Sequence, residues 1–332
     1  MMAKSSNQKL KILYLMRLFL EQTDENHSIT ISDMITELDR YDISAERKSI
    51  YDDIESLKTF GLDIEVKKSK TTDYYLASRP FELAELKLLV DAVQCSKFVT
   101  HKKSLELIKK IENLTSKKQA MALQRQVYVA NRVKGINENI YYNVDCLHSA
   151  IAENKKVSFK YFDYTINKEK LYRKNGADYY ASPIALSWDD ENYYLIVYYG
   201  KHNNFVHYRV DRMSTIEILD QARDTIPDEE NFNVAEYTKK VFSMFGGNDE
   251  IVRLQFKNGL VNQVIDRFGS DINIEKVDEE SFSVRIPVKV SSPFFSWVAQ
   301  FGTEIRIISP ENVKEKFLEN LNEIFNQYNE LI

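Results

Sequence analysis

The sequence predicts a multidomain protein of the α+β class. Its 332 residues, 43% of them hydrophobic, exceed the roughly 250 to 300 residues at which a single core stops growing. Hydrophobic residues recur at helical spacing in the first part of the chain, and from Val157 onward they alternate with the period of a strand. With only nine Gly and six Pro the chain has few loose linkers, so we expect about two to four packed units.

The N-terminal residues predict two helices. Residues 8 to 21 are apolar on nearly every side, so a helix here would be covered on more than one face. Thr30 and Asp33 have the spacing of a capping box, in which each side chain bonds the backbone N–H of the other residue. Apolar residues then recur at helical spacing as far as Tyr41, which predicts a short second helix.

A third helix and a hairpin complete this unit. Ser44 is a suitable N-cap and Gly61 a suitable C-terminal stop, so we expect a helix that begins at Ser44. Alternating residues around Ile64 and again at Tyr74 predict two strands on either side of a polar tip. Three helices followed by a hairpin are typical of a winged helix-turn-helix, which we assign to residues 1–78.

The middle of the chain changes from helices to strands. Two helical patterns with a polar break near Thr100 predict a helical bridging segment over residues 79–138. Beyond it, short strands separated by Asn, Asp and Gly turns predict a small β-barrel within residues 139–225. The expected strands are residues 157–161, 179–186, 192–199 and 204–219.

Residues 226–332 alternate strands and helices. This alternation predicts a small ferredoxin-like α+β unit at the C-terminus. The expected order is strand 251–256, helix 260–268, strands 272–277 and 281–290, helix 293–301, strand 304–308 and a final amphipathic helix.

Charge and cysteine content restrict the class of protein. The formal net charge is −5, which argues against nonspecific coating of nucleic acid because such binding needs many Lys and Arg. A sequence-specific DNA binder with a small basic surface is still allowed. Neither a signal peptide nor an uncharged stretch of ~20 residues is found, and Cys95 and Cys146 suggest no disulfide framework. We therefore expect a cytoplasmic protein with no membrane contact.

The third helix carries the candidate DNA-reading residues. With Ile50 facing the core, one polar face of the helix points toward the position of a major groove. The alternative is an ordinary solvated helix face, which Asp52 and Glu55 favour because carboxylates repel phosphates. The residues expected to contact DNA are Ser44, Arg47, Lys48 and Tyr51.

The tip of the hairpin is rich in lysine. Lys67, Lys68 and Lys70 have no apolar role and suit contacts with phosphates. A lysine-rich hairpin tip also serves solubility alone, and this reading stays open.

The predicted barrel carries a pair of arginines. Arg209 and Arg212 suit a phosphate or carboxylate because a guanidinium donates bidentate hydrogen bonds. The side chains expected to stack on a base or donate to one are Tyr161, Tyr194 and His207. In the alternative reading, Asp211 pairs with a neighbouring arginine and the tyrosines are packed core.

No enzyme signature is found. The sequence lacks GxGxxG, GxxxxGK[ST], GxSxG and HExxH motifs. Its five histidines are scattered, so metal-ligand spacing is absent as well. We expect no catalysis, no cofactor and no metal.

Three blocks of residues, in this order, resemble the bacterial WYL-domain transcriptional regulators. The first looks like the recognition helix of their winged helix, the second is similar to the strands that name the WYL module, and the third resembles their C-terminal extension. Tyr193 stands where the module has its eponymous Trp. The blocks are ERKSIYDDI (46–54) with Leu57 and Gly61; SPIAL (182–186), YYL (193–195) and YRVDRM (208–213); and DRFG (266–269), WVAQFG (297–302) and Ser309-Pro310.

The resemblance implies a fold and a function. It implies that the barrel is a WYL domain with an Sm-like, SH3-like fold, and that the protein is a DNA-binding homodimer. It also implies a ligand at the barrel, with nucleic acid or a nucleotide as the favoured class. Ser182 joins the candidate ligand site through this resemblance alone.

We therefore expect a transcriptional regulator whose homodimer binds a pseudo-palindromic, double-stranded DNA operator and whose WYL domain senses a ligand. Ligand at the surface of Arg209 and Arg212 would change the spacing or mobility of the two DNA-reading helices. The alternative is a non-catalytic interaction module in which the winged helix docks a protein partner or mediates dimerisation.

Overall fold

The computed structural model describes residues 8–68, 71–123, 139–227 and 232–329. The chain divides into two compact units, Met1–Glu138 and Asn139–Ile332. Each unit contains helices and sheets, so the expected multidomain fold of mixed α and β structure is confirmed.

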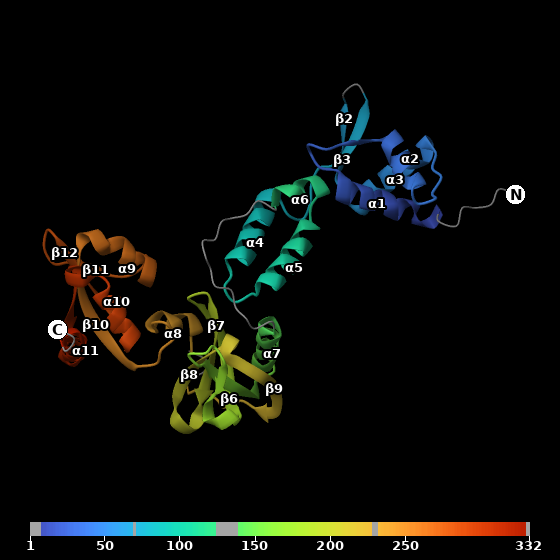
Figure 1. Ribbon diagram of the computed structural model, residues 1–332. Helices are drawn as coiled ribbons and strands as arrows, with labels where there is room; N and C mark the ends of the chain where they lie inside the picture. The colour runs from blue at the N-terminus through green and yellow to red at the C-terminus, as the bar shows by residue number, and fades with distance from the viewer. Residues whose placement is uncertain (1–7, 69–70, 124–138, 228–231, 330–332) are drawn as a thin grey trace. The chain divides into compact units, whose positions relative to one another are not determined.

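The N-terminal unit begins with three helices and a three-stranded antiparallel sheet of order β1-β3-β2. Figure 1 shows the β2–β3 hairpin standing away from the helices. The short strand β1 was not predicted from the sequence. The elements are α1 (Lys11–Gln22), β1 (Ile29–Thr30), α2 (Ile31–Asp39), α3 (Arg47–Phe60), β2 (Ile64–Lys68) and β3 (Thr72–Leu76).

Local signals explain where these elements begin and end. The predicted capping box is present, because Thr30 and Asp33 each accept a hydrogen bond from the other's backbone N–H. Gly61 ends α3 with a φ of +116°, a conformation that suits glycine, and its N–H donates to the carbonyl of Leu57. One buried stripe of α3 then packs into the core with the other helices and the sheet.

The predicted start of the third helix was wrong. Ser44 lies before the helix, whose N-cap is Glu46 and whose first residue is Arg47. Asp42 has a left-handed backbone and Ile43 is fully buried. The chain therefore turns into the core first, and the helix begins only when the Glu46 carbonyl accepts from the N–H of Ile50.

Three helices follow in the same unit. Thr100 caps the second of them, with its side chain accepting from the N–H of Lys103. A small core of Leu86, Val90, Ile108 and Leu123 joins the three. They are α4 (Leu83–Cys95), α5 (His101–Glu112) and α6 (Lys117–Leu123), and the rest of the predicted bridging segment, 124–138, lies outside the described residues.

The second unit opens with a helix and a six-stranded antiparallel sheet. The strand order is β5-β4-β6-β7-β8, and β9 pairs with β4. The short β5 was not expected. The elements are α7 (Ile140–Ala152), β4 (Lys155–Tyr164), β5 (Lys170–Tyr172), β6 (Tyr179–Asp189), β7 (Asn192–Tyr199), β8 (Asn204–Arg209) and β9 (Met213–Ala222).

The single strand predicted over residues 204–219 is two strands. A turn of 3-10 helix, Val210–Arg212, separates β8 from β9. Val210 is fully buried at this corner, and the two strands pair with different neighbours, β8 with β7 and β9 with β4. An alternating sequence does not reveal such a corner because both strands keep the same period.

A second, four-stranded antiparallel sheet has the order β11-β12-β10-β13. From β10 onward the order of elements along the chain is the one that the sequence predicted, whereas the helix α8 before it was not predicted. The elements are α8 (Val234–Lys240), β10 (Asn248–Lys257), α9 (Val261–Phe268), β11 (Ile274–Lys276), β12 (Ser281–Val290), α10 (Ser292–Ala299), β13 (Ile305–Ser309) and α11 (Glu311–Asn329).

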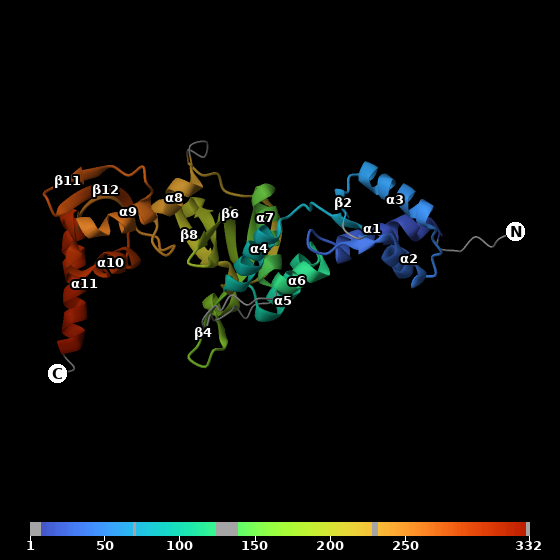
Figure 2. The same ribbon diagram turned by 90° about the horizontal axis from the view of Figure 1, so that it is seen from above.

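One face of this sheet carries the core. Val252, Leu254 and Phe256 of β10 are buried, whereas Ile251, the residue before Val252, is exposed. Side chains of α9 and α10 belong to the same hydrophobic cluster as these three, so both helices cover that face. Figure 2 shows α11 running away from the sheet, and its first part packs on the core through Val313.

Candidate nucleic-acid interface and effector surface

The outer face of α3 is basic at its beginning. Arg47 and Lys48 are exposed and, within the described part of the chain, form no hydrogen bond or ion pair. Tyr51 lies one turn further and is 41% exposed. Its ring meets the ring of Tyr74 in β3 edge-on, with 6.5 Å between centroids. Tyr51 therefore connects the face of α3 to the hairpin.

Two acidic side chains of α3 are neutralised within the unit. Asp53 pairs with Lys11 of α1, with 2.7 Å between Nζ and Oδ2. Glu55 pairs with Lys58 in the next turn at 3.3 Å. The first turn of α3 contains no acidic residue, while Glu46 at its N-cap and Asp52 in its second turn are exposed.

The hairpin adds further cations. Lys67 and Lys68 end β2, are exposed, and form no hydrogen bond or ion pair among the described residues. Lys70, the third predicted contact, lies outside the described residues. The predicted residue Ser44 is exposed on the loop before α3.

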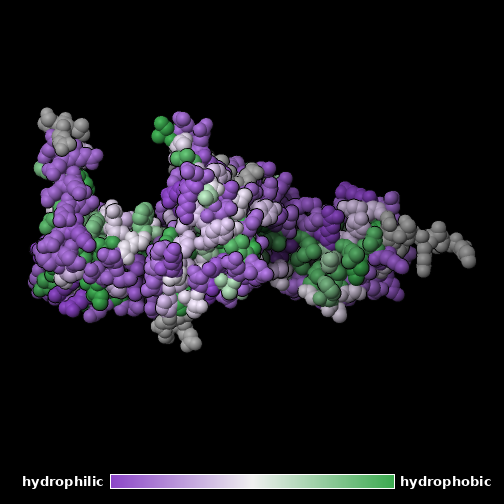
Figure 3. Space-filling model, turned by 90° about the horizontal axis from the view of Figure 1, so that it is seen from below, coloured by the Kyte–Doolittle hydropathy of each residue, from purple (hydrophilic) through white to green (hydrophobic). Residues whose placement is uncertain are grey.

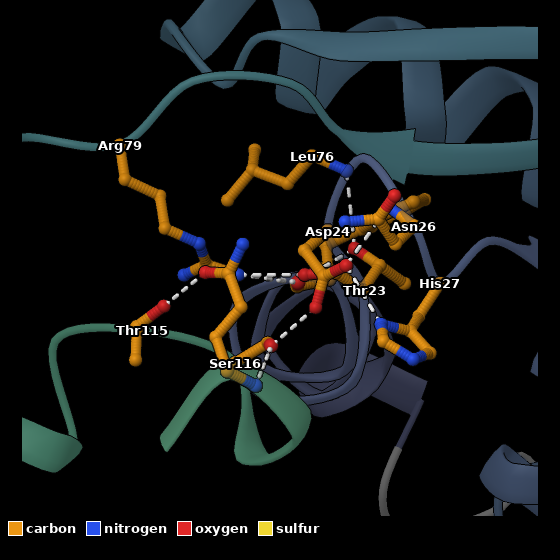
Figure 4. Close-up of polar contacts among 10 residues, drawn as sticks. Thr23, Asp24, Asn26, His27, Leu76, Arg79, Thr115 and Ser116 are labelled. Carbon is orange, nitrogen blue, oxygen red and sulfur yellow. Dashed lines mark hydrogen bonds and ion pairs between the residues drawn. The ribbon is translucent and has the colours of Figure 1, made fainter. Parts of the chain in front are cut away.

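A polar cluster next to the hairpin holds the parts of the N-terminal unit together (Figure 4). Asp24, which is 2% exposed, accepts hydrogen bonds from the hydroxyl of Ser116 at 2.5 Å and the backbone N–H of Asn26 at 2.9 Å. It also meets Nδ1 of His27 at 2.7 Å. Ser116 in turn accepts from the N–H of Gln119 in α6. The cluster thus links the end of α1 to the start of α6.

Thr23 connects the same cluster to the hairpin. Its buried hydroxyl donates to the carbonyl of Phe19 and accepts from the N–H of Leu76, the last residue of β3. Arg79 donates to the carbonyl of Thr23 at 2.7 Å (Figure 4). The hairpin is therefore fixed to α1 through both backbone and side-chain bonds.

In the second unit, Arg209 lies at the end of β8 in a paired state. Its Nε and Nη2 donate to the two carboxylate oxygens of Asp211 at 3.0 and 2.9 Å, and Nη2 also donates to Asn192 at 2.8 Å. The hydroxyl of Tyr161 accepts from the backbone N–H of Arg209 at 3.2 Å. The pairing of Asp211 with an arginine, left open by the sequence, is present.

Arg212 belongs to a second cluster. It shares the carboxylate of Asp163 with Arg173, whose Nε donates at 2.6 Å while Nη1 of Arg212 donates at 3.2 Å. The hydrogen bond from Arg173 is the main reason why the pKa of Asp163 lies below its usual value. Two guanidinium groups face one carboxylate, so this cluster keeps a net positive charge.

Aromatic rings extend this cluster. The guanidinium of Arg173 lies 5.2 Å from the ring centroid of Tyr161, and Nζ of Lys174 lies 3.9 Å from that of Tyr179. Lys174, Asn175 and Gly176 have consecutive positive φ angles of 51°, 53° and 81°. Sequence reasoning missed Arg173 and Lys174, although the turn-forming Asn175-Gly176 pair next to two cations was a readable signal.

The other predicted ligand residues make internal contacts. Ser182 is buried, and its hydroxyl accepts from the N–H of Asp224. Tyr194 is half-buried beside a hydrophobic cluster, and burial raises its pKa. Ser182 is thus committed to the interior, whereas Tyr194 stands opposite Arg209 in the pairing of β7 with β8.

His207 is also committed to internal bonds. Its Nδ1 lies 2.6 Å from the carbonyl of Met244, which can only accept, so Nδ1 carries the proton. Nε2 then accepts from the hydroxyl of Tyr237 at 2.9 Å. Burial lowers the pKa of His207, which agrees with a neutral ring.

Neither a metal site nor a membrane-spanning helix is found in the described residues. Among residues 8–68, 71–123, 139–227 and 232–329, no group of at least three His, Cys, Asp or Glu could hold a metal ion. Over the same ranges no helix is both long and apolar enough to cross a bilayer.

Comparison with protein families identifies two parts of the second unit. The model of the WYL domain matches residues 142–218, and that of the WCX domain matches residues 248–325. The chain belongs to the WYL-domain transcriptional regulators. The two matches coincide with the six-stranded and four-stranded sheets of this regulator, and neither extends into its N-terminal unit.

Among solved structures, the regulator is similar to the proteasome accessory factor B/C (PafBC) of Arthrobacter aurescens. The match has 16% identity and a TM-score of 0.28, and it covers 98% of this chain and 49% of that chain. The regulator thus spans about half the length of that protein. No curated protein matches the chain.

Proposed function

We propose that this WYL-domain regulator binds double-stranded operator DNA through its N-terminal unit and senses an effector through its WYL domain. In this proposal α1 to β3 form a winged helix-turn-helix, the six-stranded sheet is an Sm-like barrel, and the four-stranded sheet with α9 and α10 is ferredoxin-like. The observation that carries the DNA half is the set of four exposed, unpaired cations on α3 and the hairpin of an otherwise acidic chain. They are Arg47, Lys48, Lys67 and Lys68.

The position of two of these cations favours an anionic partner. Arg47 and Lys48 occupy the first turn of α3, where the helix dipole is positive and cations are unfavourable by roughly 0.3–1 kcal/mol each. A phosphate at this end would be attracted both by the side chains and by the free backbone N–H groups. These two cations are therefore unfavourable for the helix by itself, and a bound DNA phosphate would offset that unfavourable energy.

Two exposed apolar surfaces support the homodimer that a pseudo-palindromic operator requires. Figure 3 shows hydrophobic residues gathered on one face of the N-terminal unit. In this unit Leu13 and Leu20 of α1 are exposed, as is Leu10 directly before the helix. The second surface is the far part of α11, where exposed side chains recur at the spacing of a coiled-coil seam. They are Leu318, Leu321, Phe325 and Tyr328.

A mobility-shift experiment tests the DNA half. Sequencing of the DNA that co-purifies with the protein supplies the operator. Lys48→Ala and Tyr51→Ala should each weaken operator binding about 5- to 100-fold, the effect of removing one base contact. Lys58→Ala is the matched control, because Lys58 lies on the same helix but pairs with Glu55. Unchanged binding in both test variants would favour the alternative, a winged helix that docks a protein partner.

The effector half rests on the arginine clusters. Arg212, Arg173 and Lys174 offer net positive charge beside the rings of Tyr161 and Tyr179, which suits a nucleotide or nucleic acid. Arg209 already donates bidentately to Asp211, so an anion there has to displace that carboxylate. The effector would act by preferring one of two dimer states that differ in operator affinity.

The double variant Arg209→Ala plus Arg212→Ala tests this half. It should lose the response of operator binding to the effector while it binds the operator normally without effector. A full response in this variant would refute the site. We propose no catalytic role for the regulator and place it in the cytoplasm of a bacterium.

A further inference from the structure

A pocket of about 640 Å³ lies between the WYL sheet and the first turns of α10 in the second unit. On one side it is lined by Asp189 and Asp190 at the β6–β7 turn, and on the other by Arg267 from α9 and Trp297 from α10. The third conspicuous block of the sequence, DRFG and WVAQFG, supplies both Arg267 and Trp297. Nothing in the proposed function uses this block.

Arg267 is held in place but retains donor capacity. Its guanidinium lies 4.3 Å from the ring centroid of Phe242, and Nη2 donates to the carbonyl of Val241 at 2.9 Å. Its Nε is buried and has no hydrogen-bond partner in the described part of the chain. A buried donor without an acceptor is costly, so an acceptor supplied by a ligand would be favourable here.

Asp189 faces the same space without touching Arg267. Burial raises the pKa of Asp189, and the charge of Arg267 opposes this effect. No ion pair within 4.0 Å joins the two side chains in the described residues, although each feels the other's charge. The pocket thus presents an acceptor and a donor that are close enough to interact but are not bonded.

Aromatic side chains and tight turns shape the walls. Phe242, Phe245 and Trp297 line the pocket, and Phe245 is 59% exposed. The turn that carries Phe245 contains Ser243 and Met244 with φ angles of 48° and 57°. Left-handed backbone is uncommon for such residues and is a frequent feature of binding sites.

The β6–β7 turn, on the opposite side of the pocket, also contains residues with a left-handed backbone. Asp190 and Glu191 have φ angles of 42° and 60°, so the hairpin that carries Asp189 is also tightly folded. Both borders of the pocket are therefore fixed by the backbone rather than by long flexible loops.

We propose that this pocket binds a purine base, and that guanine is the base it fits best. A base stacks on aromatic side chains and is hydrogen-bonded along its edges. Guanine has donors, N1–H and the 2-amino group, for the carboxylate of Asp189, and acceptors, O6 and N7, for the guanidinium of Arg267. This inference goes beyond the proposed function, because the pocket shares no residue with the Arg212 and Arg173 cluster, and the binding itself needs no DNA.

Tryptophan fluorescence of the full-length protein tests the pocket. The chain has two tryptophans, Trp188 and Trp297, so Trp188→Phe leaves Trp297 as the sole reporter. Guanosine should quench this emission saturably as its ring stacks in the pocket. Adenosine and cytidine, which lack guanine's combination of donors and acceptors, should bind at least ~10-fold more weakly.

Two substitutions in the Trp188→Phe background make the test specific. Asp189→Asn and Arg267→Lys should each weaken guanosine binding at least ~10-fold, and Asp189→Asn removes no bond from the core. Asp220→Asn is the matched control, since Asp220 is fully exposed on β9, and it should bind guanosine normally. No saturable quenching, equal binding of all three nucleosides, or normal binding in Asp189→Asn would each overturn the proposal.

The outcome is separable from that of the proposed function. A protein that binds its operator but not guanosine refutes the pocket alone. A protein that binds guanosine but no DNA supports the pocket and refutes the regulator's proposed DNA contact.

Discussion

Asp24 and Ser116 lie 92 residues apart in the sequence and are joined by a hydrogen bond of 2.5 Å between Oδ2 and Oγ. Both residues are almost completely buried. Asp24 follows α1, and Ser116 directly precedes α6, so the bond connects the proposed DNA-binding helices with the bridging helices. A buried carboxylate with several donors is strongly favoured over one that has lost them, which makes this contact a point where the N-terminal unit can be tested.

Replacement of Asp24 should destabilise the N-terminal unit. Asp24→Asn keeps the size of the side chain but removes the charge that accepts from Ser116, Asn26 and His27. We expect the free energy of unfolding to fall by about 2–3 kcal/mol, because hydrogen bonds to a buried charged group are lost. Chemical denaturation of the full chain measures this, and Asp39→Asn on the exposed end of α2 should change it by less than ~0.5 kcal/mol. Equal stability of the two variants would contradict the role of the cluster.

The same carboxylate should make stability depend on pH. Burial alone would raise the pKa of Asp24, but the hydrogen bonds from Ser116, His27 and Asn26 outweigh burial and place the pKa below its ordinary 3.8. A lowered folded-state pKa stabilises the fold above the unfolded pKa, and this contribution is lost as the pH falls through the folded value. The stability difference between wild type and Asp24→Asn should therefore be constant above about pH 5 and shrink in more acidic solution. Denaturation at a series of pH values measures this stability difference. A difference that stays constant in acidic solution would contradict the prediction.

Two adjacent glycines before β10 should respond differently to a methyl group. A Cβ on Gly247 would lie 2.1 Å from the carbonyl oxygen of Val290, whereas one on Gly246 meets nothing within 4 Å. Gly247→Ala must push apart two paired strands, so it should lower the stability of the second unit by roughly 1–3 kcal/mol. Gly246→Ala should leave the melting temperature nearly unchanged, and similar melting of both variants would count against the close approach.

The hairpin should contribute to DNA binding through charge alone. Lys67→Ala is expected to reduce the slope of log Kobs against log salt by about 0.9, the loss of one phosphate contact. The effect should be the same on operator and nonspecific DNA, because a phosphate contact carries no sequence information. Mobility shifts at several salt concentrations measure the slope, with Lys58→Ala as the reference. An unchanged slope for Lys67→Ala would remove the hairpin from the interface.

The sequence was informative wherever a local pattern sets local structure. The capping box of Thr30 and Asp33, the stop at Gly61 and the order of elements after Asn248 were all readable, because each depends on residues a few positions apart. Ser44 shows the limit of this reasoning. It has the chemistry of an N-cap, but the burial of Ile43 moved the start of α3 to Arg47.

The residues of the candidate site also fall into those that a local pattern reveals and those that only the tertiary structure reveals. The exposed cations of α3 and the hairpin were found from helical periodicity and from a polar tip. Arg173 and Lys174 were missed, since only the pairing of β4 with β5 brings Arg173 to Asp163 and Arg212. Ser182 was included through resemblance to the family, and its hydroxyl is instead bonded to Asp224 in the interior.

By itself, the sequence determined the class of the fold, the succession of helices and strands, and the family, because hydrophobic period and turn chemistry act over short distances. The tertiary structure alone decided which charges are free and which are paired. Arg209 and Arg47 look alike in the sequence, but Arg209 donates to Asp211 and Asn192, while Arg47 has no bond among the described residues. Whether a charge has a partner depends on chain segments brought together by packing, and no local pattern records that.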